Sequence, residues 1–407
     1  MDLRAIYLAA LERCDPAGLV EARVGAYPEL RGRPAIALGK CALRMAAGLA
    51  RGGWTGSGIA IVPAGYESDD APSGFEVVTG SHPHVDDASF RAGDALLRFA
   101  DALREPALVL LSGGASAAAE APLGPHVARE DIAAINEQLV RSGLSIGKIN
   151  VVRKHLSAIK GGRLALRLPD GSESWIVSDV RPGQPELVGS GPTSADASTS
   201  AEAAEILESI GGDIALRLAS LLRSGAIPES PTRIAHRGDV LADNRTLLTA
   251  AAEVAETNRS RSPRCVEIVD AQLDDDVESV ASALADVIER LEQGAIAIAG
   301  GEPTVTVRGR GRGGRCSELA LRLLRAAAHR DLPPFTALVG SSDGRDGSSG
   351  AAGYVVEWGG SDGSWTREIT GALAASDAHT LASRLADVIQ IPPTGNNLRD
   401  IMMMARR

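Results

Sequence analysis

Short, mostly apolar runs alternate with longer amphipathic stretches along most of the chain. Runs at 35–38, 107–111 and 335–339 have the length and composition of buried strands. The stretches Cys41 to Arg51 and Ser317 to Arg330 instead carry apolar residues at helical spacing. Strands and helices that alternate in this way predict an α/β fold with a doubly wound, mostly parallel sheet.

The chain length predicts two domains, because 407 residues exceed what one ordinary hydrophobic core organises. The stretch Ser224 to Thr232, which is rich in Ser, Pro and Gly, is typical of a linker. We therefore expect an N-terminal domain over residues 1–231 and a C-terminal α/β domain over residues 232–407.

Composition and charge exclude several classes of function. Aromatic residues make up only 3% of the chain, so Ala, Val, Leu and Ile must build the core. A net charge of −10 disfavours nucleic acid and anionic membrane as partners. No apolar run is long enough to span a bilayer, and the charged N-terminal residues do not resemble a signal peptide, so we expect a soluble, cytoplasmic protein. The four cysteines show no zinc or disulfide spacing.

Lysine is rare, because only four of the 42 basic residues are Lys. Lys40 follows a strand-like run in LGKCALRM, where a compact ammonium could reach a phosphate from a rigid position. The other three lie within Lys148 to Lys160, inside a segment, 138–169, that contains no acid. Such a local excess of positive charge would attract an anionic ligand, although a solvated basic face is the alternative.

A glycine-rich turn follows the strand-like run at 107–111. Its sequence, Ser112-Gly113-Gly114-Ala115-Ser116, leads into a helix-compatible stretch. Glycines let backbone N–H groups approach an anion, so the turn predicts a phosphate cradle, with an ordinary tight turn as the alternative. The turn matches neither the Walker A motif nor the dinucleotide fingerprint GxGxxG.

Two further loops carry candidate charged groups. The first, between Glu302 and Glu318, holds four arginines and no acid, and Arg315 at the start of the next helix is the best placed to be fixed. The second, SSDGRDG, places Asp343 and Asp346 after a strand, where Mg²⁺ with a phosphate substrate needs only one or two carboxylates. Turn-forming Asp-Gly is the alternative interpretation of this loop.

Taken together, these motifs resemble the class II glycerate 2-kinases, whose C-terminal domain is named MOFRL. The resemblance rests on AIALGK, SHP with His82 and Asp86, LLSGGAS, SDV followed by SGPT, GGEPTVTVRGRGRGGR, SDGRDG and PTGNN. The stretch INVVRKHLSAIKGGRLA, residues 149–165, is the most specific of them. The motifs run in order over nearly the whole chain, up to Asp400.

The resemblance implies an ATP- and Mg²⁺-dependent kinase that phosphorylates the 2-hydroxyl of D-glycerate to 2-phosphoglycerate. It implies a Rossmann-like N-terminal domain, a smaller MOFRL domain and an active site in the cleft between them. Lys40 and Arg315 match the catalytic lysine and arginine of the family, and Asp179, after the run Ser174 to Val177, is a third catalytic candidate. The candidate substrate and phosphate ligands within the motifs are Ser112, Gly113, Gly114, Ser116, Lys154, Lys160, Asp343 and Asn397, and the candidate Mg²⁺ ligands are Asp179, Asp343 and Asp346.

The chain also departs from the family pattern at Ala115, Gly183, Gln184, Cys316, Ser342, Gly350, Pro392 and Asn396. These departures leave two alternatives open: a kinase for another small hydroxy acid, and a catalytically silent homologue that binds a ligand. An oxidoreductase is disfavoured, because the chain lacks a dinucleotide fingerprint. The expected partners are ATP and a small hydroxy acid; a homodimer is one option that the sequence leaves open.

Overall fold

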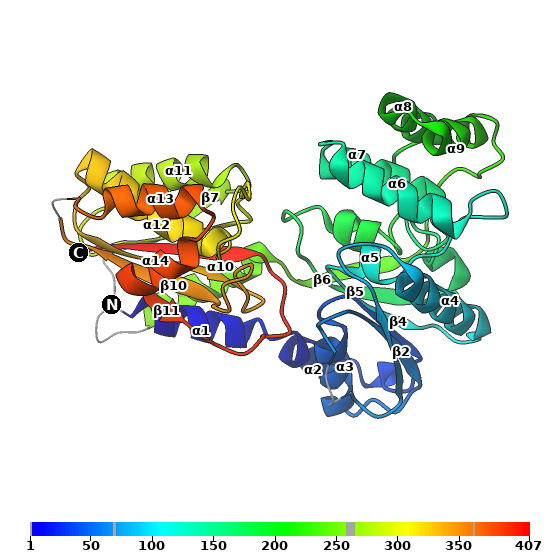
Figure 1. The fold of residues 1–407 in the computed structure, drawn as a ribbon. Helices are drawn as coiled ribbons and strands as arrows, with labels where there is room; N and C mark the ends of the chain where they lie inside the picture. Colours follow the sequence, from blue (N-terminus) through cyan, green and yellow to red (C-terminus); the bar gives the residue numbers. More distant parts are fainter. Residues whose placement is uncertain (1, 68–70, 258–264, 361–362) are drawn as a thin grey trace. The chain divides into compact units, whose positions relative to one another are not determined.

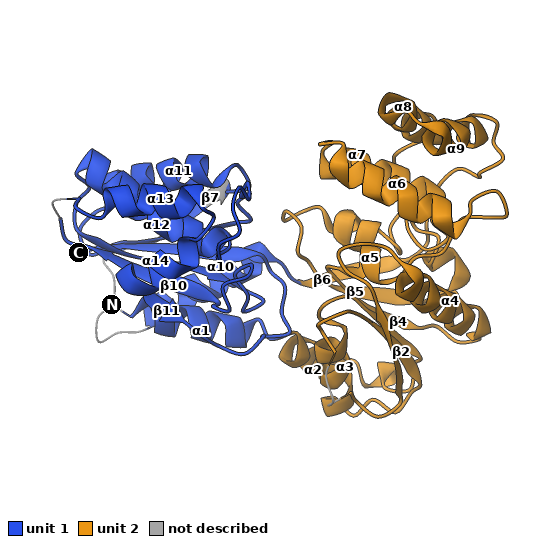
Figure 2. Ribbon diagram, viewed as in Figure 1, with its two compact units in different colours: residues 1–15, 242–407 blue, residues 16–241 orange. Residues whose placement is uncertain are grey.

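The structure is a computed structural model that describes residues 2–67, 71–257, 265–360 and 363–407. The chain forms two compact units, one of residues 16–241 and the other of residues 1–15 with 242–407 (Figure 2). Each unit is built on a six-stranded sheet with helices on both faces (Figure 1). The predicted α/β class is therefore confirmed.

The sheet of the 16–241 unit has the strand order β3-β2-β1-β4-β5-β6. Its strands are β1 (Ala35–Leu38), β2 (Gly58–Pro63), β3 (Phe75–Gly80), β4 (Leu108–Ser112), β5 (Glu173–Val177) and β6 (Arg237–Ala242). The pairs from β3 through β5 are all parallel, so the carboxyl ends of these five strands share one edge. This strand order is that of a Rossmann-type doubly wound sheet, as the sequence predicts.

The helices of this unit are α2 (Pro16–Ala26), α3 (Ala42–Arg51), α4 (Asp87–Ala102), α5 (Ala115–Ala118), α6 (Arg129–Arg141), α7 (Ile146–Leu156), α8 (Ser200–Ile210) and α9 (Asp213–Arg223). Strands β1 and β4 are wholly buried, and Ile36 and Val109 belong to the core that α4 helps to cover. A second core forms among helices α6 to α9, with Leu139 and Leu218 among its buried residues.

The sheet of the other unit has the strand order β11-β10-β9-β12-β8-β7. Its strands are β7 (Val266–Gln272), β8 (Ile296–Gly301), β9 (Phe335–Ser341), β10 (Gly353–Trp358), β11 (Asp387–Ile389) and β12 (Asp400–Arg406). Strands β7 and β8 are parallel, whereas β12 lies antiparallel between β8 and β9. Strand β12, which comes last in the chain, therefore lies in the middle of this open sheet.

Helices cover both faces of this second sheet (Figure 1). They are α1 (Leu3–Arg13), α10 (Asn244–Thr257), α11 (Val277–Arg290), α12 (Arg315–Arg330), α13 (Thr366–Ala374) and α14 (Ala378–Leu385). Apolar residues on α11 and α12, such as Leu284 and Leu323, belong to one buried core with Met402 of β12. No helix among the described residues is long and apolar enough to cross a membrane.

The observed division of the chain differs from the predicted boundary after residue 231. Strand β6 pairs at the edge of the first sheet, so the first unit continues to residue 241. Helix α1 belongs to the other unit, where the hydroxyl of Tyr7 donates a 2.6 Å hydrogen bond to the carbonyl of Ser341. Burial of α1 on β9 and α10 decides this placement, and no local pattern in the sequence signals it.

Candidate active site

The first candidate site lies at the carboxyl edge of the first sheet, where strand order reverses. From β1 the chain moves outward through β2 to β3 and then returns to place β4 on the other side of β1. Ligands of open α/β sheets bind at such a switch point, beyond the carboxyl ends of the strands. Here the two adjoining strand ends carry Lys40, after β1, and Gly113 and Gly114, after β4.

Hydrogen bonds lock these two turns to each other. The backbone N–H of Lys40 donates to the carbonyl of Gly113 at 2.8 Å. The N–H of Cys41 donates to Oγ of the buried Ser112 at 3.0 Å, and that hydroxyl donates to the carbonyl of Leu38 at 3.3 Å. The backbone of Lys40 is therefore held in place beside the glycine turn. The buried hydroxyl of Ser112 stabilises this arrangement through its hydrogen bonds to Cys41 and Leu38.

Two features require glycine at position 114: the backbone conformation there and the close approach of the Lys40 side chain. Its φ of +82° is in the left-handed region, and a Cβ there would lie 2.9 Å from Cγ of Lys40 and 3.3 Å from Cγ of Pro63. The Lys40 side chain thus passes directly over Gly114. The sequence predicts the glycine turn, but only the structure shows that the lysine packs on it.

We expect Gly114→Ala to lower turnover, because the new methyl group displaces Lys40, and to lower the free energy of unfolding by about 1–2 kcal/mol through backbone strain. Steady-state turnover and a denaturant melt measure the two effects. Gly124→Ala is the matched control, because Gly124 has a φ of +76° and a Cβ there would meet nothing within 4 Å. Equal turnover of the two variants would show that the contact with Lys40 is unimportant.

Lys40 has no acid within ion-pair distance among the described residues. Its Nζ lies 5.5 Å from the centre of the Tyr66 ring. Burial, together with the charge of Lys40 and a contribution from His84, lowers the pKa of His82 to about 4, so His82 is neutral at pH 7. Asp179 is partly buried and lies beyond the end of β5, two strands from Lys40 in the sheet.

Ser116 begins a short chain of polar contacts at the same edge. Its Oγ lies 2.8 Å from Oγ of Ser190, which in turn donates to Oδ1 of Asn150 at 3.1 Å. Ser190 is buried and has a φ of +63°, a conformation that costs a non-glycine residue energy. These contacts tie the start of α5 to helix α7, which carries the most specific motif of the chain.

Lys154 and Lys160, which are predicted as phosphate ligands, lie in surroundings that suit a structural role. Both are buried, and each has a carboxylate partner: Lys154 lies 3.3 Å from Asp196, and Lys160 pairs with the buried Glu120. Burial lowers the pKa of Lys160, and the charge of Glu120 opposes that shift. Their positive charges are neutralised inside the unit, which favours a structural role for both lysines.

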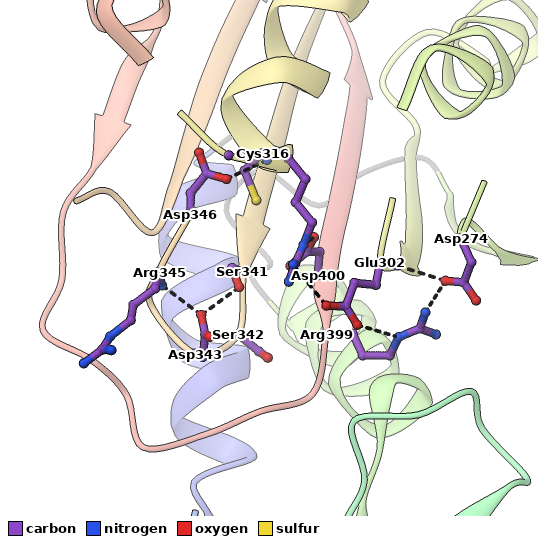
Figure 3. A network of polar contacts seen from close by, with 12 residues as sticks. Asp274, Glu302, Cys316, Ser341, Ser342, Asp343, Arg345, Asp346, Arg399 and Asp400 are labelled. Carbon is purple, nitrogen blue, oxygen red and sulfur yellow. Dashed lines mark hydrogen bonds and ion pairs between the residues drawn. The ribbon is translucent and has the colours of Figure 1, made fainter. Parts of the chain in front are cut away.

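The second candidate site lies in the other unit, at the start of helix α12 (Figure 3). Arg315 donates from Nε and Nη2 to the two carboxylate oxygens of Asp400, and the Nη2 contact is 3.1 Å. Its Nη1 also lies 3.0 Å from Oε1 of Glu302. Burial would lower the pKa of Arg315, but the charges of Asp400 and Glu302 raise it, so the guanidinium stays charged.

The two aspartates of the SSDGRDG loop have different surroundings (Figure 3). Asp346 is buried, and its oxygens accept the N–H groups of Cys316 at 2.8 Å and Ser317 at 3.1 Å. Burial raises the pKa of Asp346, although these hydrogen bonds lower it. Asp346 therefore caps the N-terminus of α12, which favours a structural role over the predicted Mg²⁺ ligand.

Asp343 is partly exposed, and one of its oxygens, Oδ1, accepts both Ser341 Oγ and the N–H of Arg345 at 2.8 Å. Asn397 is buried near the end of the PTGNN motif. Among the described residues, no three His, Cys, Asp or Glu side chains gather as a metal site. Mg²⁺ that arrives with a nucleotide needs only one or two carboxylates, so Asp343 fits that requirement better than Asp346.

Three of the departures from the family pattern are packing positions. The side chain of Cys316 is fully buried, and Ser342 accepts the N–H of Leu398 at 2.6 Å. Asn396 donates from Nδ2 to the carbonyl of Cys14 at 2.8 Å. Gly183, Gln184 and Gly350 are exposed.

Sequence reasoning missed Asp400 and Glu302 as partners of Arg315. Asp400 is 85 residues away from Arg315, and only the insertion of β12 between β8 and β9 brings the two together. The available signal was an acid directly before a strongly apolar strand, Ile401 to Ala405, where a buried carboxylate needs a cationic partner.

Comparisons with known proteins agree with this architecture. Residues 2–223 match a domain of unknown function, DUF4147, and residues 295–400 match the MOFRL family. A D-glycerate 2-kinase of Thermotoga maritima is 30% identical over 387 residues, which cover 90% of this chain and 89% of that protein. A glycerate 2-kinase of Sulfurisphaera tokodaii is 33% identical over 336 residues, which cover 80% of this chain and 79% of that protein.

The crystal structure of a glycerate kinase from Thermotoga maritima superimposes with a TM-score of 0.85 at 27% identity, and covers 99% of this chain and 98% of that one. Fold and sites thus define a two-domain α/β protein with a cationic side chain at an edge of each sheet. The chain belongs to the class II glycerate 2-kinase family, whose C-terminal part is the MOFRL domain. The predicted family is confirmed.

Proposed function

We propose that this protein is a glycerate 2-kinase, which transfers a phosphoryl group from ATP to the 2-hydroxyl of D-glycerate. The observation that carries the proposal is the fixed position of Lys40 over the glycine turn, at the switch point of a Rossmann-type sheet. Two relatives that align with most of the chain are named as glycerate 2-kinases. A reaction that consumes ATP also fits the expected cytoplasmic location.

Phosphoryl transfer requires little covalent chemistry from the protein, which must position the reactants and stabilise charge. The hydroxyl oxygen of the substrate attacks the γ-phosphorus, the bond from that phosphorus to the bridging oxygen breaks, and ADP leaves. We assign Lys40 and Arg315 to the charge on the transferring oxygens. The backbone of the Ser112 to Ser116 turn would hold phosphate oxygens through N–H groups.

The hydroxyl proton must pass to a base, and a carboxylate at a strand end is the natural acceptor. We assign this role to Asp179 or Asp343, and the other of the two would hold Mg²⁺ near the phosphates. Bound Mg²⁺ would neutralise charge on the phosphate oxygens. Asn397 would orient the substrate, whereas Lys154, Lys160 and Asp346 would keep the surrounding backbone in place.

The test is ATP consumption by the purified protein over a panel of small hydroxy acids, with separation of 2-phosphoglycerate from 3-phosphoglycerate. We expect D-glycerate to give the highest kcat/KM and 2-phosphoglycerate to be the product. Higher kcat/KM with another hydroxy acid would replace the substrate and keep the kinase. No ATP consumption with any acid of the panel would favour a silent homologue, and oxidation of NADH with hydroxypyruvate would favour a reductase.

A further inference from the structure

Arg315 belongs to a chain of alternating charges that the proposed reaction does not by itself require. Figure 3 labels the other members of this chain, Asp400, Glu302, Arg399 and Asp274. Asp400, at the buried start of β12, faces Arg315, and Glu302 lies on the far side of the same guanidinium. The other oxygen of Glu302 lies 3.8 Å from Nε of Arg399. The chain continues from Arg399 to Asp274, whose oxygen also accepts the N–H of Glu302 at 2.9 Å.

Asp400 fixes the direction in which Arg315 can bind a ligand. A guanidinium carries five N–H groups in one plane. Asp400 binds the Nε group and one Nη2 group, so the N–H groups that remain are on the two η nitrogens, at the outer end of the side chain. That end can bind two oxygens of one phosphate. The side chain of Asp400 is only 1% exposed, so this orientation is set inside the protein.

Glu302 occupies the end that a phosphate would need. Its side chain is 43% exposed, so this ion pair is weak and exchangeable compared with the buried pair to Asp400. The guanidinium of Arg399 is a second cation with which the Glu302 carboxylate can pair. Its Nε is buried and has no hydrogen-bond partner among the described residues, and a buried donor without a partner is unfavourable.

We propose that Asp400 is a positioning residue that holds Arg315 as a pre-oriented phosphate-binding fork, and that Glu302 occupies this fork until a phosphate displaces it toward Arg399. This inference rests on the proposed role of Arg315 in the kinase reaction. Displacement would give Arg399 Nε the acceptor that it lacks, and it would free Nη1 of Arg315, next to the second N–H of Nη2, for the ligand.

The first test uses Glu302→Gln, which removes the competing charge and keeps the size of the side chain. We expect the variant to bind ATP about two- to fivefold more tightly, the range that corresponds to an exposed ion pair. Glu289→Gln is the matched control, because Glu289 is 46% exposed and pairs with Arg330 at the other end of α12. A Kd for ATP that is unchanged or higher in Glu302→Gln would overturn the exchange with phosphate.

The second test asks whether Asp400 acts through Arg315. We expect Asp400→Asn to lower kcat/KM by about 10- to 100-fold, as the loss of an orienting partner typically does. The same change in an Arg315→Ala background should then add little further loss. A full additional loss in that background would show that Asp400 does not act through Arg315.

The pH dependence of the unmodified protein gives a third readout. Burial raises the pKa of Asp400 to about 6, against the opposing effects of Arg315, so the carboxylate becomes protonated below that pH. We expect kcat to fall as the pH drops through about 6, and Asp400→Asn to lack this decrease. The charged or titratable groups near Asp400 are Arg315 and Cys316 on α12, Glu302 after β8, Asp343 after β9 and Tyr7 on α1.

Protonation of Asp400 would not unfold the protein, so the expected fall in kcat at low pH would not come from a loss of stability at Asp400. Its pKa is higher in the folded than in the unfolded chain, so the folded state binds more protons between pH about 4 and about 6, and its contribution to stability rises as the pH falls. A decrease in kcat that persists in Asp400→Asn would overturn the positioning role. If Arg315→Lys keeps the turnover of the unmodified protein, the proposed role of Arg315 fails as well; if only the Asp400 or Glu302 result fails, the kinase assignment stands.

Discussion

Replacement of Lys40 by arginine is expected to lower kcat by a factor on the order of 10³, with little change in thermal stability. The ammonium group is a compact charge on a stem that lies against Gly114, and a planar guanidinium on the same stem would place its charge elsewhere. Lys40 is partly exposed and forms no buried ion pair with the part of the chain that the structure describes, so we expect folding not to depend on it. Steady-state ATP turnover with D-glycerate, beside a thermal melt, measures both effects.

Lys148→Arg is the matched control for Lys40→Arg, because Lys148 is an exposed lysine of the same unit.

Arg315→Lys should lower kcat by a comparable factor, because a single ammonium cannot bind both oxygens of Asp400 and a phosphate at once. Its control is Arg330→Lys, at the other end of α12. Unchanged turnover in Lys40→Arg or Arg315→Lys, with an unchanged melt, would remove that residue from the catalytic assignment.

Replacement of Lys160 by methionine is expected to lower the free energy of unfolding by about 3–5 kcal/mol. The change leaves the carboxylate of Glu120 buried without its cation, and Glu120 and Lys160 are both about 1% exposed. Ser157 Oγ, which donates to Glu120 at 2.5 Å, cannot replace the lost charge. A urea denaturation curve of the variant and the unmodified protein gives the difference in unfolding free energy.

The double variant Lys160→Met with Glu120→Leu should recover part of this stability, because an apolar pair leaves no charge in the core. Lys148→Met, on the surface, should change the melt very little. If Lys160→Met instead kept full stability and reduced only the affinity for ATP, Lys160 would be a phosphate ligand after all, and the buried pair with Glu120 would be secondary.

The sequence by itself determined the fold class and the turns that carry several candidate site residues, because both depend on the pattern of neighbouring residues along the chain. Buried parallel strands such as β1 and β4 are short apolar runs, and the residues that follow them must lie at the same sheet edge. Lys40 and the Ser112 to Ser116 turn were each predicted to follow such a strand, and the observed pairing of β1 with β4 places them side by side. The spacing of apolar residues also predicted α12 to within two residues of its observed start at Arg315.

Only the tertiary structure decided which charged groups are paired inside the protein and which remain for a ligand. Lys154 and Lys160 have the same sequence signal as a phosphate-binding lysine, yet Asp196 and Glu120, each at least 40 residues away, neutralise them. Asp343 and Asp346 are equivalent in the SSDGRDG motif, but Asp346 caps α12 because the fold brings that helix start to it. Burial and long-range pairing set the charge of each site, and neither is a property of neighbouring residues in the chain.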